Sequence, residues 1–236
     1  MLKDAIECIV KLGQIKTLEV NKHTYSPDHL NLIKEPSPAA LELTTLTGLV
    51  GYVKSAVDGE FHGSELLVQV VSPSEVRIYS PLCSDASRHA YVTCHPILPK
   101  IILNNFIDVE EMNIMLQSCF VPSIGSVSDV LKVVGNIKEE NVQTIGDDGI
   151  SQSVVAKSGI AIVDNVKVPN PVTLAPYRSF PEIEQVETDF VLRMKSGGNI
   201  ALFEADGGAW RVEAARRITE FLELEFSDLE GVKVIA

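Results

Sequence analysis

The sequence predicts an α+β protein, in which an antiparallel or mixed β-sheet carries several amphipathic helices. Strand-like runs at Leu66–Val71, Glu75–Tyr79 and His89–His95 follow one another, and the second and third alternate apolar and polar residues, as strands of a meander do. The segment Asp189–Phe226 reads as a strand, a tight turn, a second strand and a long helix. These two patterns predict a meander and a C-terminal β-hairpin followed by a helix.

The composition is that of a folded globular chain. Of 236 residues, 45% are hydrophobic and 22% are charged, which is ordinary usage and excludes a disordered chain. We expect one domain over residues 1–236, with a helix and an extended arm in 1–43 and the body of the fold in 44–236.

Charge and cysteine usage restrict the partners and the compartment. The net charge of −12 repels phosphate groups on average, which disfavours nucleic acid and anionic membranes, although a local basic groove would be compatible with it. No apolar run approaches the roughly 20 residues that cross a bilayer, and Asp4 and Glu7 would interrupt a signal sequence. The four cysteines form no CxxC pair, so we expect reduced thiols. A cytoplasmic protein without a membrane partner is predicted.

The first quarter of the chain predicts two helices joined by an extended arm. Leu2–Leu12 has its apolar residues on one helical face and ends at a glycine. Residues 15–43 contain one strand-like run, Ile15–Val20, and then three prolines that favour an extended arm. In the helix predicted at Leu46–Val57, Gly48 and Gly51 leave a flat patch that another backbone could approach closely.

The middle of the chain predicts two capped helices and three short strands. Asp108 begins a helix at Val109–Phe120, and another follows at Val127–Val134. The predicted strands are Asn141–Ile145, Ser151–Lys157 and Ile160–Val163. Four prolines in residues 168–183 predict an irregular segment or an edge strand, long enough for a functional loop.

The C-terminal hairpin has a predicted register. A two-residue turn at Gly197-Gly198 would pair Leu192 with Phe203 and would let Arg193 form a diagonal ion pair with Glu204. Asp206 is predicted to cap the helix that begins near Trp210, and the tail at Val232–Ile235 is predicted to return as an edge strand.

Four acidic residues beside glycines form one candidate site: Asp147, Asp148, Glu204 and Asp206. Carboxylates of this kind hold Mg²⁺ in phosphoryl-transfer sites. The alternative is structural, because Asp147-Asp148-Gly149 also fits a turn and Asp206 a helix cap, and we favour it.

Arginines near aromatic residues form a second candidate, a ligand-binding set of Tyr177, Arg178, Arg193 and Arg211, with Arg216 and Arg217 nearby. Arginine and aromatic side chains can clamp phosphates and stack bases. Acidic residues are as frequent in the same segment, so ion pairs are the favoured interpretation.

Other chemistry has less support. Cys83, His89, Cys94 and His95 have residue types that bind zinc, but their spacing matches no structural zinc pattern. Glycine-rich nucleotide-binding motifs and a nucleophile elbow are absent from the sequence. We therefore expect no cofactor, no metal and no catalytic residues.

Four motifs in the C-terminal half resemble the YfdQ-like family of phage and prophage proteins, a domain of unknown function. They are DDGISQ (Asp147–Gln152), PYRSF (Pro176–Phe180), DFVLRM (Asp189–Met194) and FEADGGAW (Phe203–Trp210). The resemblance extends from about Leu46 to Leu224 and implies a phage-encoded cytoplasmic protein, with no assigned catalytic residues.

Three functions follow as hypotheses. The leading one is a non-enzymatic phage accessory protein that works as a homo-oligomer, because of the long arm and the flat helix. The alternatives are an Mg²⁺-dependent phosphodiesterase or nuclease that uses the four carboxylates, and a module that binds nucleotides or single-stranded nucleic acid through the arginines.

Overall fold

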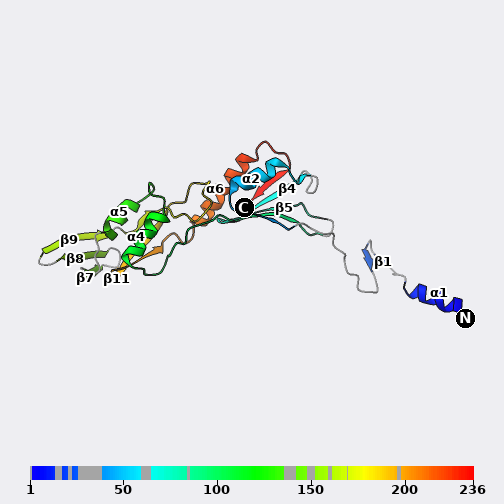
Figure 1. Cartoon of the computed structure of the whole chain (residues 1–236), viewed down its shortest axis with the longest axis horizontal. Helices are drawn as coiled ribbons and strands as arrows, with labels where there is room; N and C mark the ends of the chain where they lie inside the picture. Colours follow the sequence, from blue (N-terminus) through cyan, green and yellow to red (C-terminus); the bar gives the residue numbers. More distant parts are fainter. Residues whose placement is uncertain are drawn as a thin grey trace. The chain divides into compact units, whose positions relative to one another are not determined.

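The computed structural model (Figure 1) describes residues 2–13, 18–20, 23–25, 39–59, 65–83, 86–135, 142–147, 152–158, 161–168, 170–195 and 198–236. The chain divides into two units, residues 1–38 and 39–236. Within the described residues, no helix has both the length and the apolar character needed to cross a membrane.

The first unit contains a helix and a two-stranded hairpin. Helix α1 (Leu2–Leu12) confirms the predicted N-terminal helix. Strands β1 (Leu18–Val20) and β2 (His23–Tyr25) pair antiparallel, and β1 overlaps the predicted strand. The second strand was not predicted, since this part of the chain was expected to be an extended arm.

A five-stranded sheet in the second unit contains the predicted meander. Its order is β13-β4-β5-β6-β3. The central strands, β4 (Leu66–Ser72), β5 (Glu75–Tyr79) and β6 (Ala90–Cys94), are antiparallel, as predicted. The edges, β3 (Leu41–Leu43) and β13 (Val232–Ile235), are parallel to their neighbours. The tail therefore returns as an edge strand, and the sheet is mixed.

Helices α2 (Leu46–Ser55) and α6 (Trp210–Glu225) lie on the same side of this sheet (Figure 1). Their buried residues form one hydrophobic core with the inward side chains of the sheet. Gly48, one of the two glycines of the predicted flat patch on α2, leaves room for the cap of its own helix. An added Cβ there would lie 2.9 Å from the Oγ1 of the capping residue Thr45. At Gly51 an added Cβ would meet no described atom within 4 Å.

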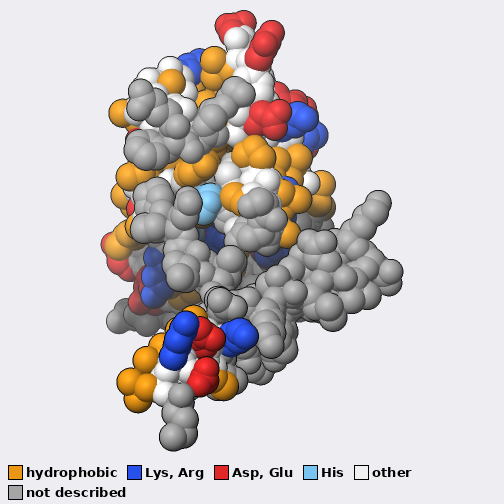
Figure 2. Space-filling model, turned by 90° about the vertical axis from the view of Figure 1, so that its right-hand side faces the viewer, with side chains coloured by type: hydrophobic (Ala, Val, Ile, Leu, Met, Phe, Trp, Pro, Cys, Tyr) orange, Lys and Arg blue, Asp and Glu red, His pale blue; other side chains and the backbone are white. Residues whose placement is uncertain are grey.

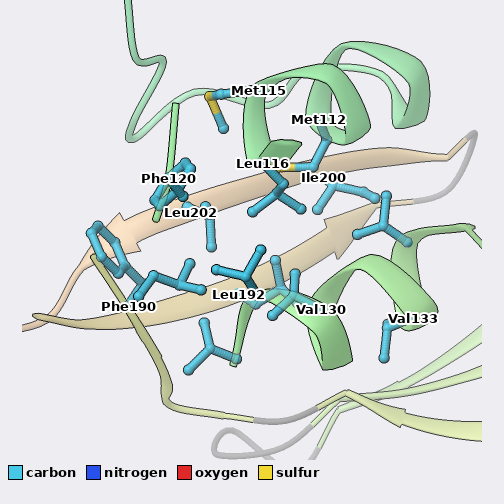
Figure 3. Close-up of a cluster of buried hydrophobic side chains, with 14 of the residues drawn as sticks. Met112, Met115, Leu116, Phe120, Val130, Val133, Phe190, Leu192, Ile200 and Leu202 are labelled. Carbon is cyan, nitrogen blue, oxygen red and sulfur yellow. The ribbon is translucent and has the colours of Figure 1, made fainter. Parts of the chain in front are cut away.

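A second core lies in the three-stranded sheet β10-β11-β12. Strands β10 (Val172–Leu174), β11 (Thr188–Lys195) and β12 (Asn199–Glu204) are antiparallel. Figure 3 shows side chains of α4 (Val109–Ser118) and α5 (Val127–Gly135) pointing toward those of the hairpin. The Asp108 carboxylate accepts a hydrogen bond from the Glu111 amide at 2.7 Å, so the predicted cap is confirmed.

The predicted register of the β11–β12 hairpin is wrong by one residue. Leu192 lies opposite Leu202 and Lys195 lies opposite Asn199, so three residues rather than two separate the paired strands. This register buries Ile200 and Leu202, which the predicted pairing would have turned away from the core. Arg193 faces Ala201 on the other side of the hairpin from Glu204, so their predicted ion pair is also wrong.

The remaining predicted strands form an antiparallel sheet. Strands β7 (Val142–Asp147), β8 (Gln152–Ser158) and β9 (Ala161–Val168) pair in the order β7-β8-β9. Strand β9 continues beyond the predicted end. The proline-bearing segment that follows contains the edge strand β10 and is otherwise irregular through Ile183, as predicted.

Candidate functional site

The PYRSF segment and the FEADGG joint meet at Arg178. This side chain is only 11% exposed, and its Nη1 donates a hydrogen bond to Glu204 Oε1 at 2.6 Å. Its Nη2 donates to the hydroxyl of Thr188. The guanidinium carbon lies 3.7 Å from the ring centroid of Trp210 and 5.8 Å from that of Phe190. Arg178 therefore joins both hairpin strands to the start of α6.

Asp206 controls the change of direction from β12 to α6. Its two carboxylate oxygens accept hydrogen bonds from the amides of Gly208 at 3.0 Å and Trp210 at 2.9 Å. Gly207 and Gly208 have φ angles of 63° and 85°, which glycine adopts without strain. The prediction that Asp206 is the N-cap is wrong, because Ala209 occupies that position and the helix begins at Trp210. Asp206 lies three residues before the N-cap and binds the amide of the first helical residue.

Gln185 fixes the backbone that carries Arg178. Its Oε1 accepts hydrogen bonds from the amides of Arg178 and Ser179, both at 3.2 Å, and its Nε2 donates to the Phe180 carbonyl at 3.0 Å. Arg217 Nη1 on α6 donates to the carbonyl of Glu184 at 3.0 Å. A buried glutamine in an irregular segment follows no periodic pattern, so sequence reasoning did not find it.

The charges of the site compensate one another. Burial lowers the pKa of Arg178 to about 10, although Glu204 and Asp206 favour its charged form. Burial alone would raise the pKa of Asp206, but the amides of Trp210 and Gly208 and the charge of Arg178 bring that pKa below its ordinary value. The Asp206 carboxylate thus remains ionised in its structural contacts.

A pocket of about 350 Å³ lies beside the joint. Four acidic residues contribute to its lining: Glu187, Asp189, Asp206 and Glu213. Asp189 accepts a hydrogen bond from Thr173, and Glu213 pairs with Arg216 and Arg217. Because the described residues of the lining include no lysine or arginine, they are poorly suited to bind phosphate.

The predicted metal site is only partly described. Glu204 and Asp206 lie at the same end of β12, where Arg178 and backbone amides bind their carboxylates. Asp148 and the side chain of Asp147 lie outside the described residues. Across the part of the chain that the structure describes, no three His, Cys, Asp or Glu side chains are placed to hold a metal ion. The residues compared include Cys83, His89, Cys94 and His95, the four residues of the weak zinc pattern.

Only two of the three predicted ligand-binding arginines lie close together. Arg178 and Arg211 both approach Trp210, with the guanidinium carbon of Arg211 5.0 Å from the ring centroid. Tyr177 precedes Arg178, and its amide donates to the Cys119 carbonyl at 2.8 Å. Arg193 lies on the other face of the hairpin. The arrangement therefore provides one buried structural arginine rather than a clamp.

Comparison with known proteins identifies no relative of this chain. No family model matches the chain, and no curated protein or solved structure does either.

Proposed function

We propose that the chain is a phage-encoded accessory protein of the host cytoplasm, which works without catalysis by assembling with copies of itself. The phage context rests on the four motifs of the C-terminal half. The assembly rests on one observation, the exposed apolar face of α1.

Within the first unit, helix α1 leaves four large apolar side chains uncovered. Leu2, Ile6, Ile9 and Val10 are exposed by 80%, 53%, 67% and 56%. In Figure 2, α1 is the described segment at the bottom, with hydrophobic and charged side chains on its surface. A helix of 11 residues is marginal in water without tertiary contacts, so a stable α1 needs a surface that covers this face.

A second copy provides such a surface. Fully burying a Leu, Ile or Val side chain contributes about 1.5–3 kcal/mol, so covering these four partly exposed residues would contribute about 4–8 kcal/mol per copy. Soluble oligomers are mostly closed and symmetric, and a short apolar helix contributed by each copy can form the centre of such an assembly.

The absence of catalysis is proposed because the best-placed carboxylates already have structural roles. Glu204 neutralises the buried Arg178, and Asp206 holds the start of α6. A catalytic use of either residue would leave Arg178 or the helix start without its partner.

Light scattering coupled to gel filtration, at micromolar concentration, tests the assembly. The parent protein is expected to be an oligomer, and Ile9→Asp is expected to reduce its mass toward that of one chain. Ile97→Asp is the matched control, since Ile97 is 84% exposed and lies outside α1, and it is expected to keep the parent mass. A monomeric parent protein, or an Ile9→Asp variant with unchanged mass, would contradict the proposal.

A further inference from the structure

A small pocket lies at the end of the five-stranded sheet where β4 and β13 begin. Its volume is about 240 Å³, and the segment that follows β5 closes one side. Its lining residues are Glu65, Leu66, Leu67, Pro81, Leu82, Arg88, Gly231 and Lys233. This pocket is separate from the site around Arg178.

The walls of this pocket, which we call the β13 pocket, are mainly apolar. Leu66 and Leu67 begin β4, and Pro81 and Leu82 come from the segment after β5. Leu82 is 63% exposed. A single exposed leucine is ordinary on a protein surface, but here it adds to an apolar wall that surrounds a hollow.

Among the lining residues that the structure describes, two are cationic and one is a carboxylate. Arg88 Nη1 donates a hydrogen bond to the Ser80 carbonyl at 2.9 Å, which orients the guanidinium group and leaves its other donors for a ligand. Lys233 is on the edge strand β13, opposite Leu67. With Glu65 as the acidic residue, the described residues of the lining carry a net positive charge in a chain of net charge −12.

We propose that the β13 pocket binds a carboxylate that is carried on a short, branched aliphatic group. The two cations would hold the carboxylate, because arginine and lysine make charge-assisted hydrogen bonds to it, and the leucines would enclose the aliphatic part. The volume of the β13 pocket lies below the 300–1,000 Å³ of typical drug-sized sites, so the ligand is about the size of one amino acid. This inference does not depend on the assembly through α1.

Two sources could supply this chemistry, a free small acid or the C-terminal residue of a peptide. Ligand-observed NMR with the full-length protein distinguishes them with 4-methylpentanoate, its amide and the corresponding amine, and with a glycyl-glycyl-leucine peptide whose terminus is free or amidated. We expect millimolar binding of 4-methylpentanoate and none of the amide or the amine. Peptide binding only with a free terminus identifies the peptide source, and no peptide binding identifies the free acid.

Variants locate the binding. Arg88→Gln and Lys233→Gln are each expected to weaken 4-methylpentanoate binding about tenfold, as the loss of a charge-assisted hydrogen bond does. Leu82→Asp, at an exposed position, is expected to abolish binding by adding a negative charge. Lys100→Gln, at an exposed lysine outside the pocket, is the control. Equal binding of acid and amide, no binding at millimolar concentration, or no effect of Leu82→Asp in a protein with unchanged unfolding temperature would overturn the proposal.

Discussion

Replacing Arg178 by methionine is expected to destabilise the protein strongly. Methionine keeps the apolar stem but removes the cation that lies between Glu204 and Trp210. Breaking a fully buried ion pair from one side costs about 3–5 kcal/mol, because the remaining charge stays buried without its partner. Glu204 is 23% exposed, and solvent lowers that cost, so we expect about 2–3 kcal/mol.

Urea unfolding followed by tryptophan fluorescence measures this loss. Trp210 is the only tryptophan of the chain, and the Arg178 guanidinium lies against its ring, so its emission should report the removal of the cation even before unfolding. With a typical urea dependence of about 2 kcal/mol per molar, the midpoint should fall by about 1–1.5 M.

A matched arginine and a double-mutant cycle test whether the buried pair of Arg178 and Glu204 provides this stability. Arg216 pairs with two acidic residues, Glu213 and Glu220, but it is 53% exposed, so Arg216→Met should cost less than about 1 kcal/mol. Glu204→Gln combined with Arg178→Met should cost less than the sum of the two single changes. If Arg178→Met costs no more than Arg216→Met, or if the two changes simply add, the buried pair does not hold this site together.

Two further predictions concern backbone strain and acid stability. Gly125→Ala should cost about 3 kcal/mol or more by thermal or urea unfolding, since φ is +70° and the new Cβ would lie 2.1 Å from the Thr173 carbonyl oxygen. Gly207→Ala, with φ of +63° and open space, should cost only about 1 kcal/mol, and equal costs would contradict this account. Hydrogen bonds from Arg216 and Arg217 lower the pKa of Glu213 from 4.5 to about 2. The ion pairs of the Glu213 carboxylate therefore stabilise the fold at neutral pH, and this stabilisation is lost as the pH falls from 4.5 to about 2. The destabilisation caused by Glu213→Gln should therefore disappear toward pH 2, and a pH-independent effect would refute the assignment.

Local signals in the sequence predicted most of the elements. The cap at Asp108 and the alternation in Glu75–Tyr79 depend only on residues close in the chain, and the structure confirms both. The prediction of the hairpin register was wrong because the two glycines fit a two-residue turn, whereas the length of the turn depends on which hairpin residues the helices bury. Leu192 and Leu202 face each other since both enter a core that includes α4 and α5.

The site around Arg178 was predicted only in part. Both motifs that meet there were identified, and the preference for ion pairs over a phosphate clamp agrees with the contact between Arg178 and Glu204. The partner was missed because it is 26 positions away in the sequence and no periodic pattern connects the two. Gln185 was missed for a related reason, since its hydrogen bonds serve an irregular segment.

The order of the two cores along the chain has a consequence for folding. Strand β13 pairs with β4 at the other end of the second unit, and the core of the five-stranded sheet needs both α2 and α6. The core of α4, α5 and the hairpin is formed by residues between these two parts. During synthesis, we therefore expect the core of α4, α5 and the hairpin to form first. The edge of β4 remains unpaired until β13 has been synthesised. Until then that strand is open to pairing with other chains, so slow or interrupted translation near the C-terminus should favour aggregation.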